Sequence, residues 1–239
     1  MPYHWDGDRI LQRNTSVHAV RVVVGHPDAK VWTDLRQWIT STDMDEVKRV
    51  LAKIDDLPWT KKRGEFDNRA GLVWQWVAKE IRYVSDENSQ DRGNFYQFPA
   101  ETIALGFGDC EDSAFLLASL LIASGISEYC VRVVMGSVKW DDNRVSEGHV
   151  WVVYKDETGI WRLIEPTLSK DDLPDDLESP ETWPCADDCS KRGERPWYVP
   201  DLCLNQSHIW SIREIPDDVE GFVSRHKKKS TRHKSVEQI

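Results

Sequence analysis

The sequence predicts an α+β fold in which a buried helix packs on an antiparallel β-sheet. Up to residue 125, apolar side chains recur at helical spacing. From residue 129 the pattern changes to short β-branched runs separated by turn residues, which indicates strands. The 239 residues, of which 40% are hydrophobic, suffice for one globular domain with extensions.

Composition argues against several classes of protein. A net charge of −10 is unlike that of a dedicated nucleic-acid-binding protein, so nucleic acid is not an expected partner. No run of 18 apolar residues is present, and we expect no membrane partner. The chain start lacks the apolar stretch of a secretory signal, and five cysteines are an odd, sparse set. We therefore expect a cytoplasmic protein, while composition leaves its oligomeric state open.

Residues 1–67 form an N-terminal extension of strand and helix that we expect to pack on the core. The β-branched run at 17–24 predicts a strand. Apolar spacing over 31–39 predicts a short helix. Asp43 opens a capping-box-like sequence and predicts a second helix that stops near Pro58.

Residues 68–170 are the predicted catalytic core, and helices come first. One helix is expected over 68–84, followed by a loop over 85–107. A third helix begins near Cys110 and ends at Gly125, which is suited to a left-handed C-cap. The apolar residues of this helix occupy almost all of its sides, so the helix should be buried.

The rest of the core is predicted sheet, with strands over 129–138, 148–154 and 160–164. Beyond the core, residues 171–215 are rich in Pro and Trp and show little periodicity, which predicts an irregular cover. Residues 216–239 end in a basic, non-periodic tail that we expect to be disordered.

Cys110 is a candidate nucleophile because it falls at a predicted helix start. There the helix dipole and unpaired backbone N–H groups lower the pKa of a thiol. A nucleophilic thiol also needs a base that is oriented by a third group. His149 opens one predicted strand and Glu165 ends the next. If 156–158 is a three-residue loop, His149 and Glu165 are directly opposed across the hairpin and share a face.

Three ordered motifs resemble the transglutaminase-like cysteine peptidase superfamily, particularly its bacterial branch. They are GDCEDSAFLLASLL, GHVWVVY and WRLIEPT, preceded by YQFPAETI. The resemblance implies a papain- and transglutaminase-like core and a Cys-His-acid triad of Cys110, His149 and Glu165. The family usually has Asp at the third position, so Asp141 and Asp156 are the fallback acids.

The resemblance implies a thiol-dependent amide or peptide hydrolase that forms a thioester acyl-enzyme and acts on a protein or peptide. No cofactor is required for this chemistry. Two alternatives stay open: acyl transfer to an amine, as in protein transglutaminases, and an inactive peptide-binding module. The backbone N–H of Cys110 is one expected donor to the oxyanion, and Gln97 or the Trp74 indole is the candidate second donor.

The acids beside Cys110 oppose thiolate formation, because negative charge raises the pKa of a thiol. We expect the helix start and the histidine to outweigh them. Asp109 is the expected N-cap of the helix. The resemblance offers a second role, since some bacterial members bind calcium through acids that flank the cysteine. Asp109 and Glu111 are the matching positions, and carboxylate oxygens suit Ca²⁺.

A second group of potential metal ligands lies in the cover. Cys185, Cys189, Cys203 and His208 are residue types that bind zinc, but their spacing is unlike that of common zinc motifs. Unligated cysteines and a Cys185–Cys189 disulfide are the alternatives.

Overall fold

The centre of the molecule is a six-stranded antiparallel sheet in the order β1-β10-β9-β6-β7-β8. The computed structural model describes residues 5, 11–12, 16–23, 26–39, 45–54, 65–85, 95–139, 147–177, 179–190 and 196–212. The strands of the sheet are β1 (Leu11–Gln12), β6 (Val131–Lys139), β7 (Glu147–Lys155), β8 (Trp161–Ile164), β9 (Trp197–Leu204) and β10 (Ile209–Ser211). The fold class predicted from the sequence is therefore confirmed.

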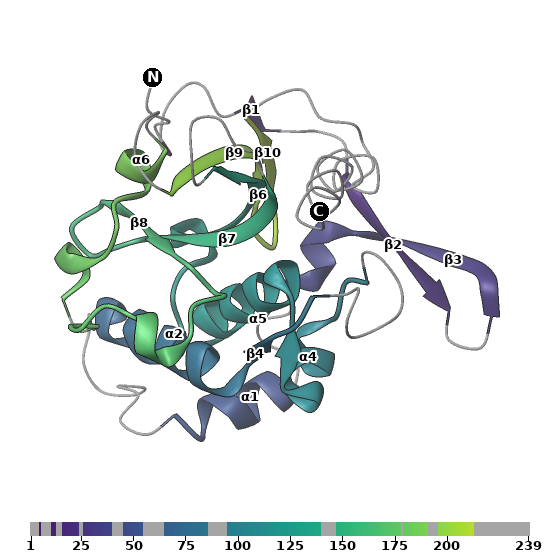
Figure 1. Ribbon diagram of the computed structural model, residues 1–239, viewed down its shortest axis with the longest axis horizontal. Coiled ribbons are helices and arrows are strands. Elements are labelled where there is room, and N and C mark those ends of the chain that lie inside the picture. The colour runs from purple at the N-terminus through teal and green to yellow at the C-terminus, as the bar shows by residue number, and fades with distance from the viewer. Residues whose placement is uncertain are drawn as a thin grey trace, which may run out of the picture.

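Helices cover one face of this sheet, and α5 lies against β6 and β7 (Figure 1). The helices are α1 (Asp45–Leu51), α2 (Phe66–Glu80), α4 (Pro99–Leu105), α5 (Cys110–Ala123) and the short α6 (Ala186–Cys189). Four 3₁₀ turns are η1 (Leu35–Trp38), η2 (Glu128–Cys130), η3 (Lys170–Asp172) and η4 (Pro180–Thr182). None of the helices in the described ranges combines the length and the apolar composition needed to cross a membrane.

Alternation along the strands divides the core between the two faces of the sheet. Val133 and Val152 pack toward the helices, whereas Val134 and Trp151 point to the other face. There Trp5, from the start of the chain, and α6 cover a smaller cluster. Both faces are thus closed, as expected for strands that are almost continuously apolar.

Helix α5 is the buried helix that the sequence predicts. Phe115, Leu116 and Leu117 are successive residues of one turn, and all three are fully buried. The helix begins at Cys110, and Gly125 follows its C-cap with a φ of 95°. Such a φ favours glycine, which explains why the helix ends there.

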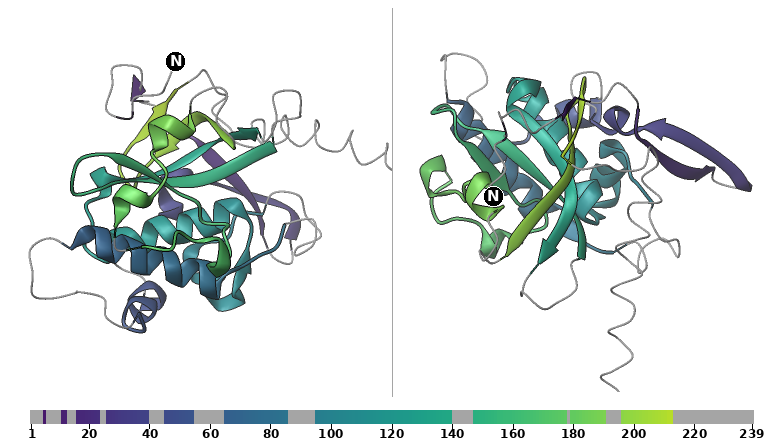
Figure 2. Two further views of the ribbon diagram at one scale, coloured as in Figure 1. Left: turned by 60° about the vertical axis from the view of Figure 1, so that its left-hand side comes forward. Right: turned by 90° about the horizontal axis from the view of Figure 1, so that it is seen from above.

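The extension before the core differs from the prediction. Residues 31–34 belong to β3 (His26–Asp34), which pairs with β2 (His18–Val23), so a helix over 31–39 is wrong. Only η1 is helical, because Val31 and Trp32 are exposed on a hairpin that projects from the body (Figure 2). The predicted strand over 17–24 is confirmed. The predicted helix is present as α1, while Asp43 and Pro58 lie outside the described residues.

The predicted loop over 85–107 contains a helix, α4. Pro99 lies in its first turn, where a missing N–H costs nothing, and Gly106 ends it with a φ of 68°. The preceding helix, α2, stops at Glu80 because β4 (Arg82–Tyr83) pairs in parallel with β5 (Phe107–Gly108). The expected helix over 68–84 is therefore too long at its end.

Strand β9 lies inside the sheet, between β6 and β10, where the sequence predicts irregular cover. Pro200 and Asp201 interrupt its apolar pattern, and the register shifts where Pro200 faces Gly136. A Cβ on Gly136 would lie 2.2 Å from the carbonyl oxygen of Val199, so only glycine permits this close approach. The predicted basic tail lies outside the described residues.

The hairpin between β7 and β8 differs in register from the prediction by two residues. Val152 pairs with Ile164, whereas a three-residue loop would pair Val152 with Arg162. The turn runs over 156–160, since the Asp156 carboxylate accepts the N–H groups of Thr158 and Ile160. A shift of two residues leaves every side chain on its predicted face. His149 and Glu165 therefore lie on the same face of the hairpin, as predicted, although the predicted register is wrong.

Asp156 should stabilise this hairpin strongly. Its carboxylate accepts a 2.7 Å hydrogen bond from Arg162, and both side chains are buried. Asp156→Asn should lower the free energy of unfolding by about 3 kcal/mol, because it leaves a buried guanidinium without its counter-charge. Urea unfolding measures the loss. Glu46→Gln breaks an exposed ion pair with Arg49 and is the control, with an expected effect of about 0.5 kcal/mol. Equal effects of the two substitutions would contradict this assignment.

Candidate active site

His149 and Glu165 form a hydrogen-bonded pair at the centre of the site. Nε2 of His149 lies 2.8 Å from Oε2 of Glu165. Strand β7 supplies the histidine, and the residue after β8 supplies the acid. Because the register places them diagonally rather than directly opposite, the longer side chain of Glu, compared with Asp, helps to span the gap.

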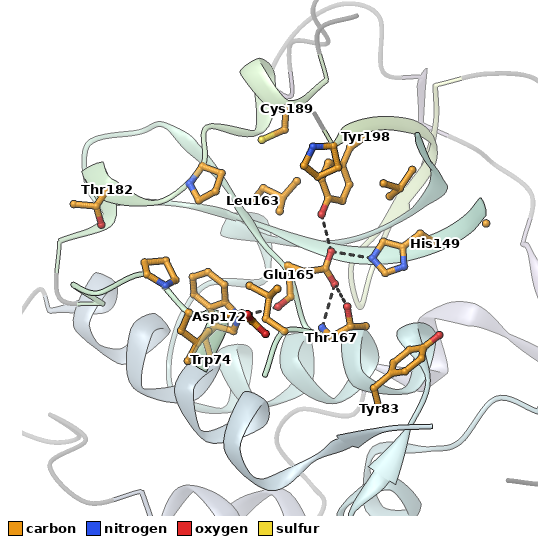
Figure 3. A pocket seen from close by; sticks show the side chains of 17 residues that line it. Trp74, Tyr83, His149, Leu163, Glu165, Thr167, Asp172, Thr182, Cys189 and Tyr198 are labelled. Atoms are coloured by element: carbon orange, nitrogen blue, oxygen red, sulfur yellow. Dashed lines mark hydrogen bonds and ion pairs between the residues drawn. The ribbon is translucent and has the colours of Figure 1, made fainter. Parts of the chain in front are cut away.

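Glu165 is buried and its carboxylate accepts several hydrogen bonds (Figure 3). Oε1 accepts the N–H and the hydroxyl of Thr167 at 3.1 and 2.6 Å. Oε2 accepts the Tyr198 hydroxyl at 2.9 Å, in addition to His149. Burial alone would raise the pKa of Glu165, but the positive charge and hydrogen bond of His149 and the Thr167 donors hold it below its usual value. Glu165 is therefore an ionised carboxylate within the protein.

Cys110 is the first residue of α5, and its sulfur lies beside β7. The Val150 backbone N–H is within hydrogen-bonding reach of this sulfur and lowers the thiol pKa slightly. Strand β8 pairs with β7 only from Val152 onward, so the helix start approaches β7 where it is not paired with β8. The structure thus brings Cys110 next to the strand residue that follows His149.

The start of α5 is fixed by a carboxylate and a glycine. Asp109 is the N-cap, as predicted, and Asp112 accepts its N–H at 3.2 Å. The other oxygen of Asp112 accepts the N–H of Gln97 at 2.7 Å and ties the segment before α4 to the helix. A Cβ on Gly108 would lie 2.6 Å from Cβ of Asp112, which explains the glycine of the GDC sequence.

The electrostatics at Cys110 differ from the expectation. Desolvation, followed by the charges of Glu111 and Asp109, raises the pKa of the Cys110 thiol well above its ordinary value. The thiol donates a 3.1 Å hydrogen bond to the Glu111 carboxylate. Burial and the two carboxylates thus oppose the expected activation of the thiol by the helix start and the histidine.

The two candidate oxyanion donors have different environments. The Trp74 N–H donates to the backbone carbonyl of Glu165 at 2.9 Å, so Trp74 supports the acid rather than an oxyanion. Gln97 is fully buried, and its amide oxygen and nitrogen have no hydrogen-bond partner among the described residues. A buried amide of this kind is costly unless something binds it. Gln97 is the better candidate on these grounds.

Asp109, Cys110 and Glu111 form a compact cluster, with their potential ligand atoms within 4.8 Å of one another. Two of the three are buried carboxylates, which fit a hard cation such as Ca²⁺, whereas a thiol does not. The donor set thus fits calcium through Asp109 and Glu111.

The other candidate residues do not come together. Within the described residues, Cys185, Cys189, Cys203 and His208 form no group of metal ligands, and none of the three cysteines takes part in a disulfide. The described residues therefore bring together neither a zinc site nor a Cys185–Cys189 disulfide, the two less favoured interpretations of these cysteines. Of the fallback acids, Asp156 holds the hairpin, and Asp141 lies outside the described residues.

Tyr198 is a site residue that sequence reasoning missed. It comes from β9, whose interrupted apolar pattern gave no indication of a strand. Only its position in the sheet brings its hydroxyl to Glu165. Thr167, in contrast, follows the acid within the WRLIEPT motif, where a local turn could have been expected.

A cavity of about 740 Å³ adjoins His149 and Glu165 (Figure 3). Its wall combines side chains from α2, the sheet and the segment that follows β8. The lining residues are Trp74, Tyr83, Val138, Gly148, His149, Leu163, Glu165, Thr167, Leu168, Asp172, Leu173, Pro174, Thr182, Pro184, Cys189, Pro196 and Tyr198.

Comparison with known proteins supports a relationship to the transglutaminase-like superfamily. Residues 59–166 match the model of the transglutaminase-like superfamily, which confirms the resemblance seen in the sequence. This part of the chain is therefore similar to a transglutaminase-like core. The match spans α2, α5 and strands β6 to β8, and so contains Cys110, His149 and Glu165.

Among solved structures, the chain is similar to LapG of Legionella pneumophila. The identity is 17%, over 74% of this chain and 85% of that chain, with a TM-score of 0.47. For a calcium-bound form of LapG the identity is 16%, over 78% of this chain and 86% of that chain, with a TM-score of 0.46. For an EGTA-treated form the identity is 16%, over 83% of this chain and 95% of that chain, with a TM-score of 0.47. No curated protein matches the chain.

Glu165 should make stability depend on pH. Because its pKa is lower in the folded protein than in the unfolded chain, it stabilises the fold above about pH 4.3, and this contribution is lost as the pH falls through the folded pKa. Urea unfolding of Glu165→Gln should therefore show a larger deficit relative to wild type at pH 7 than at pH 3.5. Glu80→Gln changes an exposed carboxylate and should show no such difference. A deficit that grows on acidification would contradict the assignment.

Proposed function

We propose that this protein is a thiol-dependent amide hydrolase, a cysteine peptidase that acts through Cys110, His149 and Glu165. The observation that carries the proposal is the 2.8 Å hydrogen bond between His149 and Glu165. His149 immediately precedes Val150, whose backbone N–H interacts with the Cys110 sulfur. An ionised acid that orients an imidazole, on the strand next to a thiol at a helix start, supplies the groups that activate a thiol nucleophile. The match to the transglutaminase-like superfamily supports the same reaction class.

The proposed reaction proceeds through a thioester. The Cys110 sulfur attacks the amide carbonyl carbon while His149 removes the thiol proton, since burial and the neighbouring acids favour the neutral thiol. Glu165 accepts a hydrogen bond from Nε2 of the imidazole and stabilises the imidazolium. Nδ1 is therefore the nitrogen that receives the thiol proton. His149 then protonates the departing amine, and water hydrolyses the thioester. The Cys110 backbone N–H and the Gln97 amide are the proposed oxyanion donors.

A calcium ion held by the carboxylates of Asp109 and Glu111 would neutralise the two charges that oppose a thiolate. It supplies no bond-making chemistry of its own. The protein residues carry out nucleophilic attack and proton transfer.

Replacing the nucleophile tests the function directly. Cys110→Ala should abolish cleavage of a denatured protein substrate, and His149→Ala should reduce kcat/KM by at least about 10³-fold, because the members of such a triad act as a unit. Mass spectrometry of the products measures cleavage, and circular dichroism checks the fold. Cys130→Ala, which changes a thiol remote from the site, is the matched control.

Unchanged cleavage by Cys110→Ala would refute the proposal. Product formed only when a primary amine is added would instead establish acyl transfer. An intact protein that binds peptides without cleaving them would indicate a binding module.

Calcium should raise the melting temperature of the protein, because a ligand that binds only the folded state stabilises it. At calcium concentrations 100 times the Kd, the stabilisation is about 2.7 kcal/mol, which corresponds to roughly 5–10 °C for a chain of this size. Differential scanning calorimetry with CaCl₂ or EGTA measures the shift. Asp109→Asn and Glu111→Gln should abolish it, whereas Asp172→Asn should not. An equal shift in all variants would place the calcium elsewhere.

A further inference from the structure

The cavity beside the catalytic pair begins where the proposed chemistry takes place. His149 and Glu165 both contribute to its wall, together with Gly148 at the start of β7. A group bound in the cavity therefore lies next to the proposed general base and the acid that orients it, whereas Cys110 is not among the lining residues. This continuity distinguishes it from the second large hollow, between α2 and residues 170–177, which contains no triad residue.

The walls of the cavity are mainly apolar. Trp74, Tyr83 and Tyr198 supply aromatic rings, and three leucines and three prolines supply further apolar surface. Two leucines, Leu168 and Leu173, are only partly buried, although both pack against the main core. Leaving such side chains accessible is unfavourable for the free protein, and a bound apolar group would remove them from water.

Several polar groups on the wall are already engaged in hydrogen bonds within the protein. The hydroxyls of Tyr198 and Thr167 donate to Glu165. The Thr182 hydroxyl has two backbone carbonyls within reach, those of Asp176 and Ser179. Recognition by this surface must therefore depend on shape and apolar contact more than on hydrogen bonds to the guest.

We propose that this cavity binds one large apolar side chain of the substrate polypeptide, aromatic or branched aliphatic, close to the scissile amide. The proposal rests on the peptidase function proposed above and names the specificity of that same site. A volume of about 740 Å³ is within the usual range of binding pockets and accommodates the largest side chains.

The distances along a substrate are compatible with this assignment. An extended polypeptide advances roughly 3.3 Å per residue, so a residue one or two positions from the scissile bond lies within about 7 Å of it. His149 lies on the cavity wall, so we expect a side chain from such a residue to reach the cavity. The preference should therefore appear at one fixed position within two residues of the cleaved bond.

A basic side chain is the competing guest, because Asp172 also lies on the wall. Its carboxylate is exposed to solvent and accepts a 2.6 Å hydrogen bond from the Ser169 hydroxyl. An exposed carboxylate attracts a cation only weakly in water. The apolar walls, in contrast, are the larger part of the surface, and we assign the cavity to an apolar guest.

The cleavage specificity of the full chain tests this assignment. A denatured proteome is digested, and the new N-termini are identified by mass spectrometry. Wild type should show large apolar residues enriched at one fixed position near the cleaved bond. Leu168→Trp, which fills the cavity, should lower the ratio of cleavage at large over small residues by about tenfold or more. Leu105→Trp adds the same ring at an exposed site on α4, outside the cavity, and should leave this ratio unchanged.

A binding measurement separates failure of the cavity assignment from failure of the proposed function. Saturation-transfer NMR with Cys110→Ala protein should detect N-acetyl-phenylalanine amide but not the alanine or lysine amides, and Leu168→Trp should remove the signal. Binding without any cleavage by wild type would refute the peptidase and retain the cavity. Cleavage without an apolar preference, equal effects of the two Trp substitutions, or a preference for the lysine amide would overturn the cavity assignment.

Discussion

A buried carboxylate, Glu165, imposes the constraint on which the arrangement of this molecule depends. A negative charge is expensive to remove from water unless several donors replace the solvent. Here the donors come from β7 through His149, from β9 through Tyr198 and from the following turn through Thr167, while Trp74 of α2 binds the carbonyl of the same residue. Satisfying one carboxylate therefore fixes the relative positions of most elements around the site.

The opposite situation exists at Cys110, where carboxylates lie beside a buried thiol. Burial and the acids raise the pKa of this thiol and so favour its neutral form. The helix dipole acts as about half an elementary charge, whereas the Glu111 carboxylate is in hydrogen-bond contact with the sulfur. In the proposed reaction, the imidazole or a cation at the acids has to offset this effect before the sulfur reacts.

Local patterns in the sequence predicted the parts of the structure that local physics decides. Helix α5 and strands β6 to β8 followed from unbroken apolar runs, and the pairing of His149 with Glu165 required only that the two share a face. Strand β9 was missed because Pro200 and Asp201 are tolerated only through neighbours distant in the sequence. Tyr198 was missed with it. The thiol pKa depends on burial, which a sequence does not give.

The position of β9 also affects when activity can arise during synthesis. The strand that carries Tyr198 lies in the middle of the sheet, yet it follows the whole Cys-His-acid set in the chain. A nascent polypeptide whose last emerged residue precedes Trp197 contains Cys110, His149 and Glu165, but lacks the strand that joins β6 to β10. The central sheet, and the hydrogen bond from Tyr198 to Glu165, can therefore form only after β9 has been synthesised.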